Sequence, residues 1–230
     1  MSILCTICAR KGSKGVASKA LRLLNNKPLI SYTVEQALNS KVFDYVVVST
    51  DSQTIAAKAK VFGAERCFIR SKELSTDTAG KIPVIRNVLI EAEKFYKKNF
   101  DIIVDLDITS PLRNVSDIKN ALEYFIKTNA DNLITGCPSK KNPYFNMVEV
   151  INGKVQVIKK LEKRITRRQD APETYEMNAS IYIWKRKVLL SSEELFTDKT
   201  SLYVMKENQS IDIDNENDLN IVEFLLKKRS

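Results

Sequence analysis

The stretch that decides the fold is ILCTICARKGSKG, residues 3–15. Its first half is an apolar run of the kind that forms a buried strand, and its second half combines glycines, a serine and cations. Glycines let backbone N–H groups approach a phosphate, and cations neutralise the phosphate charge. A buried strand that runs straight into such a loop is typical of α/β proteins that bind a polyphosphate, with an ordinary solvated loop as the alternative. The spacing is neither that of a P-loop nor that of the three-glycine dinucleotide fingerprint.

Strand-like and helix-like segments alternate after this loop. We expect strands at residues 3–8, 45–50, 66–69, 100–106, 132–137 and 179–184, and helices from residue 28 and at 51–62, 78–98 and 115–127. Such alternation predicts an α/β fold with a mostly parallel sheet and helices on both faces. No low-complexity linker or internal repeat divides the chain, so we expect residues 1–230 to form a single domain.

An insertion at about residues 138–177 changes the pattern. Asn152-Gly153 lies between two apolar runs, which predicts a β-hairpin. A polar, basic segment follows, as far as residues 167–170. A hairpin with a basic extension that interrupts an α/β domain indicates a lid or a dimerisation arm, and an ordinary surface insertion is the alternative.

Composition excludes several classes of function. The net charge is +9, but the cations alternate with acids and lack the aromatic interleaving of single-strand binders. We therefore expect no nucleic-acid partner, with a basic RNA-binding protein as the alternative. No apolar run approaches the roughly 18 residues that span a bilayer, and no signal-peptide pattern is present, so we expect a cytoplasmic protein without a membrane partner. The chain has no histidine, which excludes Ser-His-Asp and Cys-His mechanisms. Cys5 and Cys8 should point to opposite faces of their strand, as structural residues.

Acidic residues mark two further places. In SIDID, residues 210–214, a strand would put Asp212 and Asp214 on one face, where they repel unless a cation such as Mg²⁺ lies between them. A solvent-facing edge strand or a set of helix caps is the alternative. Asp107 follows the expected strand at 100–106, where open α/β sheets bind ligands. Asp105, one period deeper, is equally suited to a structural role.

These motifs, in this order, resemble those of the acylneuraminate cytidylyltransferases, the CMP-sialic acid synthetase family. They are Ala9-Arg10 with Ser13-Lys14-Gly15, then Lys19, VSTD at 48–51, STDTA at 75–79, TSPLR at 109–113, RRQD at 167–170, Asn178 and SIDID at 210–214. The resemblance covers essentially the whole chain. It implies a Rossmann-like nucleotidyltransferase fold, a homodimer whose inserted arm meets the partner subunit, and transfer of CMP from CTP to the anomeric hydroxyl of a nine-carbon α-keto acid sugar. The CMP-sugar would serve surface glycan or flagellin glycosylation.

The resemblance also implies roles for individual residues. It assigns the triphosphate to Arg10, Gly12, Ser13, Lys14, Gly15 and Lys19, and the nucleoside to Arg70, Asp77, Thr78 and Ala79. It assigns the sugar to Asp107, Thr109, Ser110, Arg168, Gln169 and Asn178, and Mg²⁺ to Asp212 and Asp214. Catalysis would rest on Arg10, Lys19 and Asp214. The proton acceptor stays open between a metal-bound hydroxide and a carboxylate such as Asp107 or Asp214.

Two departures from the family pattern bear on the substrate. Ala20 stands where the family usually has Asn, which is the one feature in favour of a catalytically inactive nucleotide-binding regulatory module. Asp107-Ile108 replaces the Gln-Pro of the sialic acid enzymes. This change favours the CMP-legionaminic acid synthetase branch, with N-acetylneuraminate and pseudaminate as alternative sugars. As a further alternative, Asp107 would be a second metal ligand.

Overall fold

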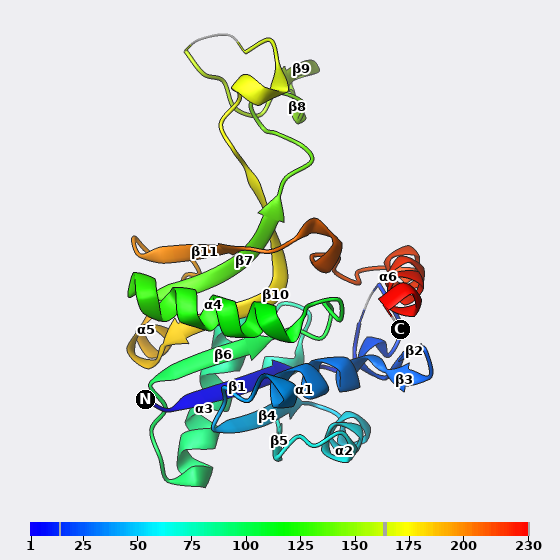
Figure 1. Ribbon diagram of the computed structural model, residues 1–230, viewed down its shortest axis with the longest axis vertical. Coiled ribbons are helices and arrows are strands. Elements are labelled where there is room, and N and C mark those ends of the chain that lie inside the picture. The colour runs from blue at the N-terminus through cyan, green and yellow to red at the C-terminus, as the bar shows by residue number, and fades with distance from the viewer. Residues whose placement is uncertain (14, 163–164, 230) are drawn as a thin grey trace.

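The computed structural model describes residues 1–13, 15–162 and 165–229, and these residues form a central seven-stranded sheet (Figure 1). The strand order is β11-β7-β10-β6-β1-β4-β5. β10 runs antiparallel to both of its neighbours, and the other neighbouring pairs are parallel. The predicted mostly parallel α/β sheet is therefore confirmed. The strands are β1 (Ile3–Cys8), β4 (Tyr45–Thr50), β5 (Arg66–Ile69), β6 (Ile102–Leu106), β7 (Asn132–Pro138), β10 (Tyr175–Lys185) and β11 (Thr200–Val204).

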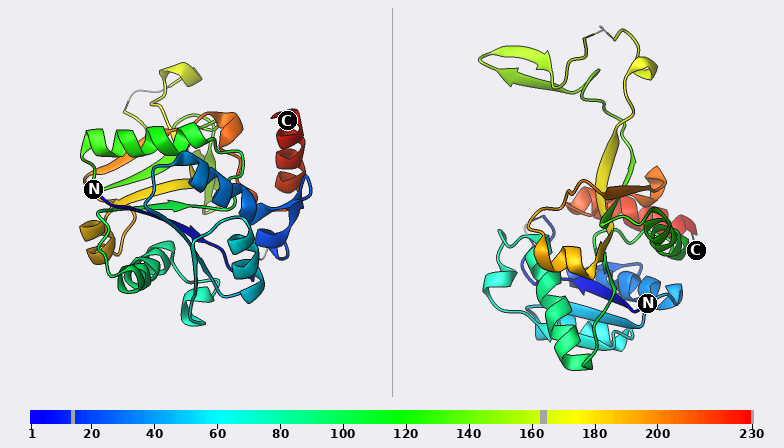
Figure 2. Two further views of the ribbon diagram at one scale, coloured as in Figure 1. Left: turned by 60° about the horizontal axis from the view of Figure 1, so that its bottom comes forward. Right: turned by 90° about the vertical axis from the view of Figure 1, so that its left-hand side faces the viewer.

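Helices cover both faces of the sheet, as expected (Figure 2). α1 (Leu29–Ser40), α2 (Gln53–Val61) and α4 (Val115–Thr128) pack on one face, and α3 (Lys81–Tyr96) and α5 (Arg186–Ser191) pack on the other. Cys5 lies in the first of these cores and Cys8 packs against the second, so the two thiols point to opposite faces. A third cluster joins α6 (Glu216–Arg229) to Val16, Leu112 and Ile213.

Local sequence signals explain where several helices begin and end. Pro28 immediately precedes α1, where its missing N–H costs no hydrogen bond. Asn114 and Asp117 form a capping box at the start of α4. Gly63 follows the end of α2 with φ of +100°, a left-handed value that only glycine adopts readily. α3 begins at Lys81 and not at residue 78 as expected, because a 3-10 turn occupies Glu73–Ser75 and an extended Gly80 precedes the helix.

The insertion forms an arm that projects from the ends of β7 and β10 (Figures 1 and 2). β8 (Val148–Ile151) and β9 (Lys154–Val157) pair as an antiparallel hairpin. Asn152 and Gly153 connect them with φ of 52° and 75°, the left-handed values of the tight turn that this dipeptide favours. The predicted hairpin is confirmed.

One sequence-based expectation is wrong, and two elements were missed. Residues 210–214 form no strand, although their alternation indicated one, and the strand β11 was not expected. A short hairpin of β2 (Leu23–Leu24) and β3 (Lys27–Pro28) was also missed. Within the described part of the chain, no helix combines the length and the apolar composition that a bilayer crossing requires.

Candidate active site

The polar motifs gather at one edge of the sheet because β1, β4 and β6 are parallel neighbours whose carboxyl ends lie together. The glycine-rich loop follows β1, the VSTD motif ends β4, and Asp107 follows β6. The Lys11 amide donates to Asp51 Oδ1 at 2.7 Å, which anchors the start of the loop to the end of β4.

The glycine-rich loop packs directly against the acidic segment at 210–214. A Cβ atom on Gly15 would lie 1.7 Å from the Asp214 carbonyl oxygen, so only glycine permits this approach. Lys19 Nζ donates to the Ile213 carbonyl oxygen and lies 3.8 Å from Asp214 Oδ1. Gly12 and Ser13 belong to the same loop, whereas Lys14 lies outside the described residues. Lys19 and Asp214, from opposite ends of the chain, thus lie beside each other.

Asp212 and Asp214 differ in environment. Asp212 Oδ1 accepts a hydrogen bond from the Ser110 hydroxyl, and Oδ2 accepts one from the Ala179 amide at 3.0 Å. Burial raises the pKa of Asp212, and the negative charges of Asp107 and Asp214 raise it further. The two hydrogen bonds lower the pKa but do not cancel this rise. The Asp214 side chain is 80% exposed.

This donor set fits a magnesium ion that is shared with a substrate. The described residues contain no group of three or more histidine, cysteine or acidic side chains that could hold a metal ion by themselves. Mg²⁺ is usually held by one or two carboxylates together with substrate phosphates, not by an all-protein cage. Asp212 and Asp214 supply two carboxylates beside a loop suited to phosphate, which is the chemistry that such an ion needs.

A pocket of about 280 Å³ opens beside the loop. It contains four of the residues predicted for nucleotide binding, namely Arg10, Arg70, Asp77 and Ala79; Thr78 does not line it. Arg10 Nη1 lies 2.5 Å from Asp77 Oδ1, and Arg70 Nη2 donates to the Ser49 carbonyl oxygen at 2.8 Å. Cys8 also lines the pocket, and burial raises the pKa of its thiol well above the usual value, which favours the neutral thiol.

Lys81, which the sequence analysis missed, lies between two carboxylates at the end of β6. Its Nζ atom is 3.1 Å from Asp105 Oδ2 and 2.8 Å from Asp107 Oδ2. Asp105 is fully buried and accepts from the Thr6 hydroxyl at 2.7 Å. Asp107 Oδ1 accepts from the amide and the hydroxyl of Thr109, both at 3.2 Å.

These contacts set the charge states of the group. Burial alone would raise the pKa of Asp107, but the Lys81 ammonium and the Thr109 hydrogen bonds outweigh it and hold that pKa below its usual value. Burial would lower the pKa of Lys81, but Asp107 and Asp105 outweigh it and raise that pKa. The one signal in the sequence was the two-residue spacing of Asp105 and Asp107, since neighbouring carboxylates repel unless a cation lies between them. The spacing did not indicate that Lys81 supplies this cation.

Asn178 and Arg113 form a buried support behind the site. Asn178 Nδ2 donates to Ser210 Oγ at 2.9 Å, and its Oδ1 accepts from the Thr135 hydroxyl at 2.6 Å. Arg113 is 1% exposed and donates to the carbonyl oxygens of Ser180 at 2.6 Å and Asp107 at 3.3 Å. Of the residues predicted for the sugar, Asp107, Thr109 and Ser110 lie at the site, and Asn178 supports the acidic segment from behind.

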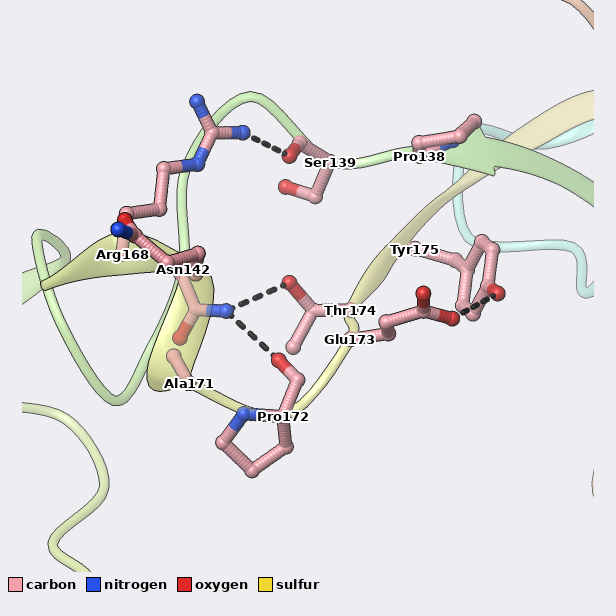
Figure 3. Close-up of a pocket in the computed structure, with 10 residues that line it drawn as sticks. Pro138, Ser139, Asn142, Arg168, Ala171, Pro172, Glu173, Thr174 and Tyr175 are labelled. Carbon is pink, nitrogen blue, oxygen red and sulfur yellow. Dashed lines mark hydrogen bonds between the residues drawn. The ribbon is translucent and has the colours of Figure 1, made fainter.

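Arg168 and Gln169 belong to the 3-10 turn Arg168–Asp170 within the insertion, whose arm projects away from the sheet (Figure 1). They line a pocket of about 510 Å³ between the segment that leads to the hairpin and the segment that returns from it. Ser139, Asn142 and Tyr175 line the same pocket (Figure 3). Arg168 Nη2 donates to the Ser139 carbonyl oxygen at 2.9 Å. Within one chain, the structure does not bring these two residues to Asp107.

Comparisons with known proteins agree with this geometry. A family model described as "Cytidylyltransferase" matches residues 4–227. The chain is 48% identical to CMP-N,N'-diacetyllegionaminic acid synthase of Campylobacter jejuni, over 99% of this chain and 96% of that protein. It is 33% identical to a pseudaminic acid cytidylyltransferase of the same species, over 99% and 97%. The solved structure of CMP:2-keto-3-deoxy-manno-octonic acid synthetase with CTP has the same fold, with a TM-score of 0.75, 17% identity and full coverage of both chains. The chain is a nucleotidyltransferase and belongs to the cytidylyltransferase family.

Proposed function

We propose that the protein transfers CMP from CTP to the anomeric hydroxyl of a nonulosonic acid, with release of pyrophosphate. The observation that carries this proposal is the contact between the glycine-rich loop at Gly15 and the acidic segment at Asp214. The contact supports the proposal because the backbone of the loop and Lys19 lie against the segment that carries Asp212 and Asp214. The nucleotide pocket adjoins the same loop through Arg10.

Legionaminic acid is the sugar that we propose. The relative named for diacetyllegionaminic acid is 48% identical to the chain, and the one named for pseudaminic acid is 33% identical. Asp107, whose Oδ2 is bound to Lys81, presents a carboxylate where the sialic acid enzymes have an amide. N-acetylneuraminate and pseudaminate are the alternatives that the assay below distinguishes.

The reaction needs positioning and charge neutralisation, and no covalent intermediate with the protein. The oxygen of the anomeric hydroxyl forms a bond to the α-phosphorus, and the bond from that phosphorus to the bridging oxygen of pyrophosphate breaks, with its electron pair leaving on pyrophosphate. The hydroxyl proton passes to a base, for which the exposed carboxylate of Asp214 is the candidate. Arg10 and Lys19 stabilise the negative charge on the phosphates, and the amides of the glycine-rich loop hold them in line. A bound Mg²⁺ ion would neutralise charge on the transferring group, and Asp212 and Asp214 are the residues that would hold it. Asp107 is a weak proton acceptor because Lys81 and Thr109 keep its pKa low.

We further propose a homodimer in which each arm reaches the partner subunit. The hairpin carries apolar side chains with no core to cover them, since Val148, Val150 and Val155 are 59%, 67% and 69% exposed. An arm that reaches a partner would bring Arg168 and Gln169 to the partner's sugar site, where arginine pairs well with a carboxylate. The cytoplasmic location and the lack of a nucleic-acid partner stay predictions.

Ala20 gives no support to an inactive module. Its side chain is fully buried among the hydrophobic residues that α1 and α2 contribute to the core. The position therefore serves packing, and the phosphate loop and acidic segment beside it are intact.

Pyrophosphate release from CTP, Mg²⁺ and each of three sugars tests the proposal. We expect the highest kcat/KM with diacetyllegionaminate, and no release when ATP replaces CTP. Absence of pyrophosphate with legionaminate, neuraminate and pseudaminate alike would refute the activity. A preference for neuraminate would refute the role of Asp107 in sugar choice.

A further inference from the structure

Lys81 lies in the wall between two pockets. One is the nucleotide pocket of about 280 Å³, and the other is a neighbouring pocket of about 300 Å³. The second pocket is formed by the start of α3 and by the face of β10 that carries Tyr182 and Trp184, whose rings stack at 5.6 Å. Lys81 Nζ lies 4.0 Å from the centroid of the Tyr182 ring, so the ammonium has an aromatic face on one side and two carboxylates on the other.

The contacts of Lys81 leave Asp107 a single orientation. Lys81 holds one carboxylate oxygen and Thr109 holds the other. An ionised carboxylate accepts hydrogen bonds and donates none. A substrate group that meets Asp107 in the nucleotide pocket must therefore present an N–H or an O–H.

We propose that Lys81 is a positioning residue that fixes Asp107 as a hydrogen-bond acceptor and thereby selects the sugar. This inference rests on the proposed function. The Lys81 ammonium already contacts Asp105, Asp107 and the Tyr182 ring, and in this proposal it acts on the sugar through Asp107. The selection arises because a sugar with a donor at this point gains a hydrogen bond to a charged acceptor that Lys81 and Thr109 already orient, and a sugar without a donor gains none.

Lys98 provides a matched control for the charge and for the aromatic contacts. Its Nζ atom lies 3.0 Å from Asp44 Oδ1 and 5.7 Å from the centroid of the Tyr45 ring. This group lies at the opposite end of the strands, because Asp44 directly precedes β4. Lys98→Met therefore removes an ion pair and a cation–π contact without touching either pocket.

The test compares sugar and CTP kinetics in Lys81→Met, Lys81→Arg and Lys98→Met. We expect Lys81→Met to raise the KM for legionaminate on the order of 10- to 100-fold, because one hydrogen bond to a charged group is lost. The KM for CTP should stay within about twofold of the wild-type value. The ratio of kcat/KM for legionaminate over neuraminate should fall by a similar factor. Lys81→Arg should recover most of the loss, and Lys98→Met should match the wild type.

A double-mutant cycle separates positioning from stability. If Lys81 acts through Asp107, then Lys81→Met costs no more than about twofold in an Asp107→Asn background. Lys81→Met leaves the buried charge of Asp105 without its ion-pair partner. The double variant Lys81→Met/Asp105→Asn lacks that charge and serves as a second test, and thermal melting shows whether each variant is folded. Additive effects in the cycle, an equal rise in the KM for CTP, or a legionaminate KM like that of Lys98→Met would each overturn the inference. If the wild type releases no pyrophosphate with any of the three sugars, the proposed function is overturned, and the inference with it.

Discussion

Gly15→Ala tests the contact on which the proposed site depends. The added Cβ would lie 1.7 Å from the Asp214 carbonyl oxygen and 2.9 Å from its carbonyl carbon. Ordinary contact begins near 3.4 Å, so loop and segment must separate by 3.4 − 1.7 = 1.7 Å. Both obstacles are backbone atoms, which no side-chain rotation can move away.

The acidic segment has little freedom to move. The Ile213 amide donates to the Thr109 carbonyl oxygen at 2.9 Å, and the Asp214 amide donates to Asp218 Oδ2 at 2.9 Å. Whichever part shifts, the phosphate-binding loop and the carboxylates lose their relative positions. A displacement of about 1 Å in an aligned site costs on the order of 10² in rate, so we expect kcat/KM to fall by at least that factor. Overpacking costs about 1–3 kcal/mol, which predicts a melting temperature lower by roughly 2–12 °C for a chain of this size.

Gly12→Ala is the comparison variant in the same loop. Among the residues that the structure describes, a Cβ on Gly12 would meet no atom within 4 Å, so the free protein should melt like the wild type. Any activity that Gly12→Ala loses therefore reports contact with the triphosphate, whereas Gly15→Ala should lose both stability and pyrophosphate release. Wild-type melting together with wild-type kcat/KM in Gly15→Ala would show that the loop and the acidic segment are independent, and our account of the site would be wrong.

Three further changes test other parts of the molecule. Arg10→Ala should lower kcat on the order of 10² or more without changing the melting temperature, as for one preorganised charge-stabilising donor, and near-normal pyrophosphate release would remove Arg10 from the mechanism. Glu93→Gln weakens the paired hydrogen bonds from Arg186 at 2.7 and 2.9 Å and should cost about 1–2 kcal/mol in urea unfolding at pH 7. Burial alone would raise the pKa of Glu93, but Arg186 and the Phe100 amide outweigh burial and lower that pKa. The stabilisation should therefore be present above about pH 4.3 and disappear as the pH falls through the lower pKa of the folded state. A difference in unfolding free energy between Glu93→Gln and the wild type that persists in acid would contradict this cause. Val150→Lys, on the exposed hairpin, should reduce the mass in light scattering from twice 26.2 kDa to a single chain with unchanged melting, and a dimer that survives would place the interface elsewhere.

The central strands and the hairpin could be predicted because their signals are local. The bounds of β1, β4 and β5 match the expectation. For β1 and β4 the reason is that continuous β-branched and apolar runs indicate strands that are covered on both faces. Asn152-Gly153 fixed the hairpin because its turn needs positive φ at both residues. The strand β11 was missed because its residues are half-buried at a sheet edge and lack a continuous apolar run.

The acidic segment shows why alternation alone is a weak guide to pairing. Residues 210–214 alternate as a strand would, and Ile213 is fully buried while Asp214 is exposed. The backbone amides of Ile213 and Asp214 donate instead to the Thr109 carbonyl oxygen and to Asp218 of α6. Lys81 was unpredictable for a related reason, because its partners are fixed by where α3 starts relative to β6 and not by any neighbour in sequence.

Of the three cations predicted to bind the triphosphate, the two that the structure describes, Arg10 and Lys19, both hold protein acceptors in the free protein. Arg10 pairs with Asp77, and Lys19 donates to the Ile213 carbonyl oxygen. Binding of CTP must therefore exchange acceptors, which lowers the net gain from each contact. The same contacts keep the two long side chains ordered, so binding need not immobilise them, a saving of about 0.5–1.5 kcal/mol for each. Because charge stabilisation in the transition state depends on donors that are already in place, this arrangement favours turnover over tight binding of the nucleotide.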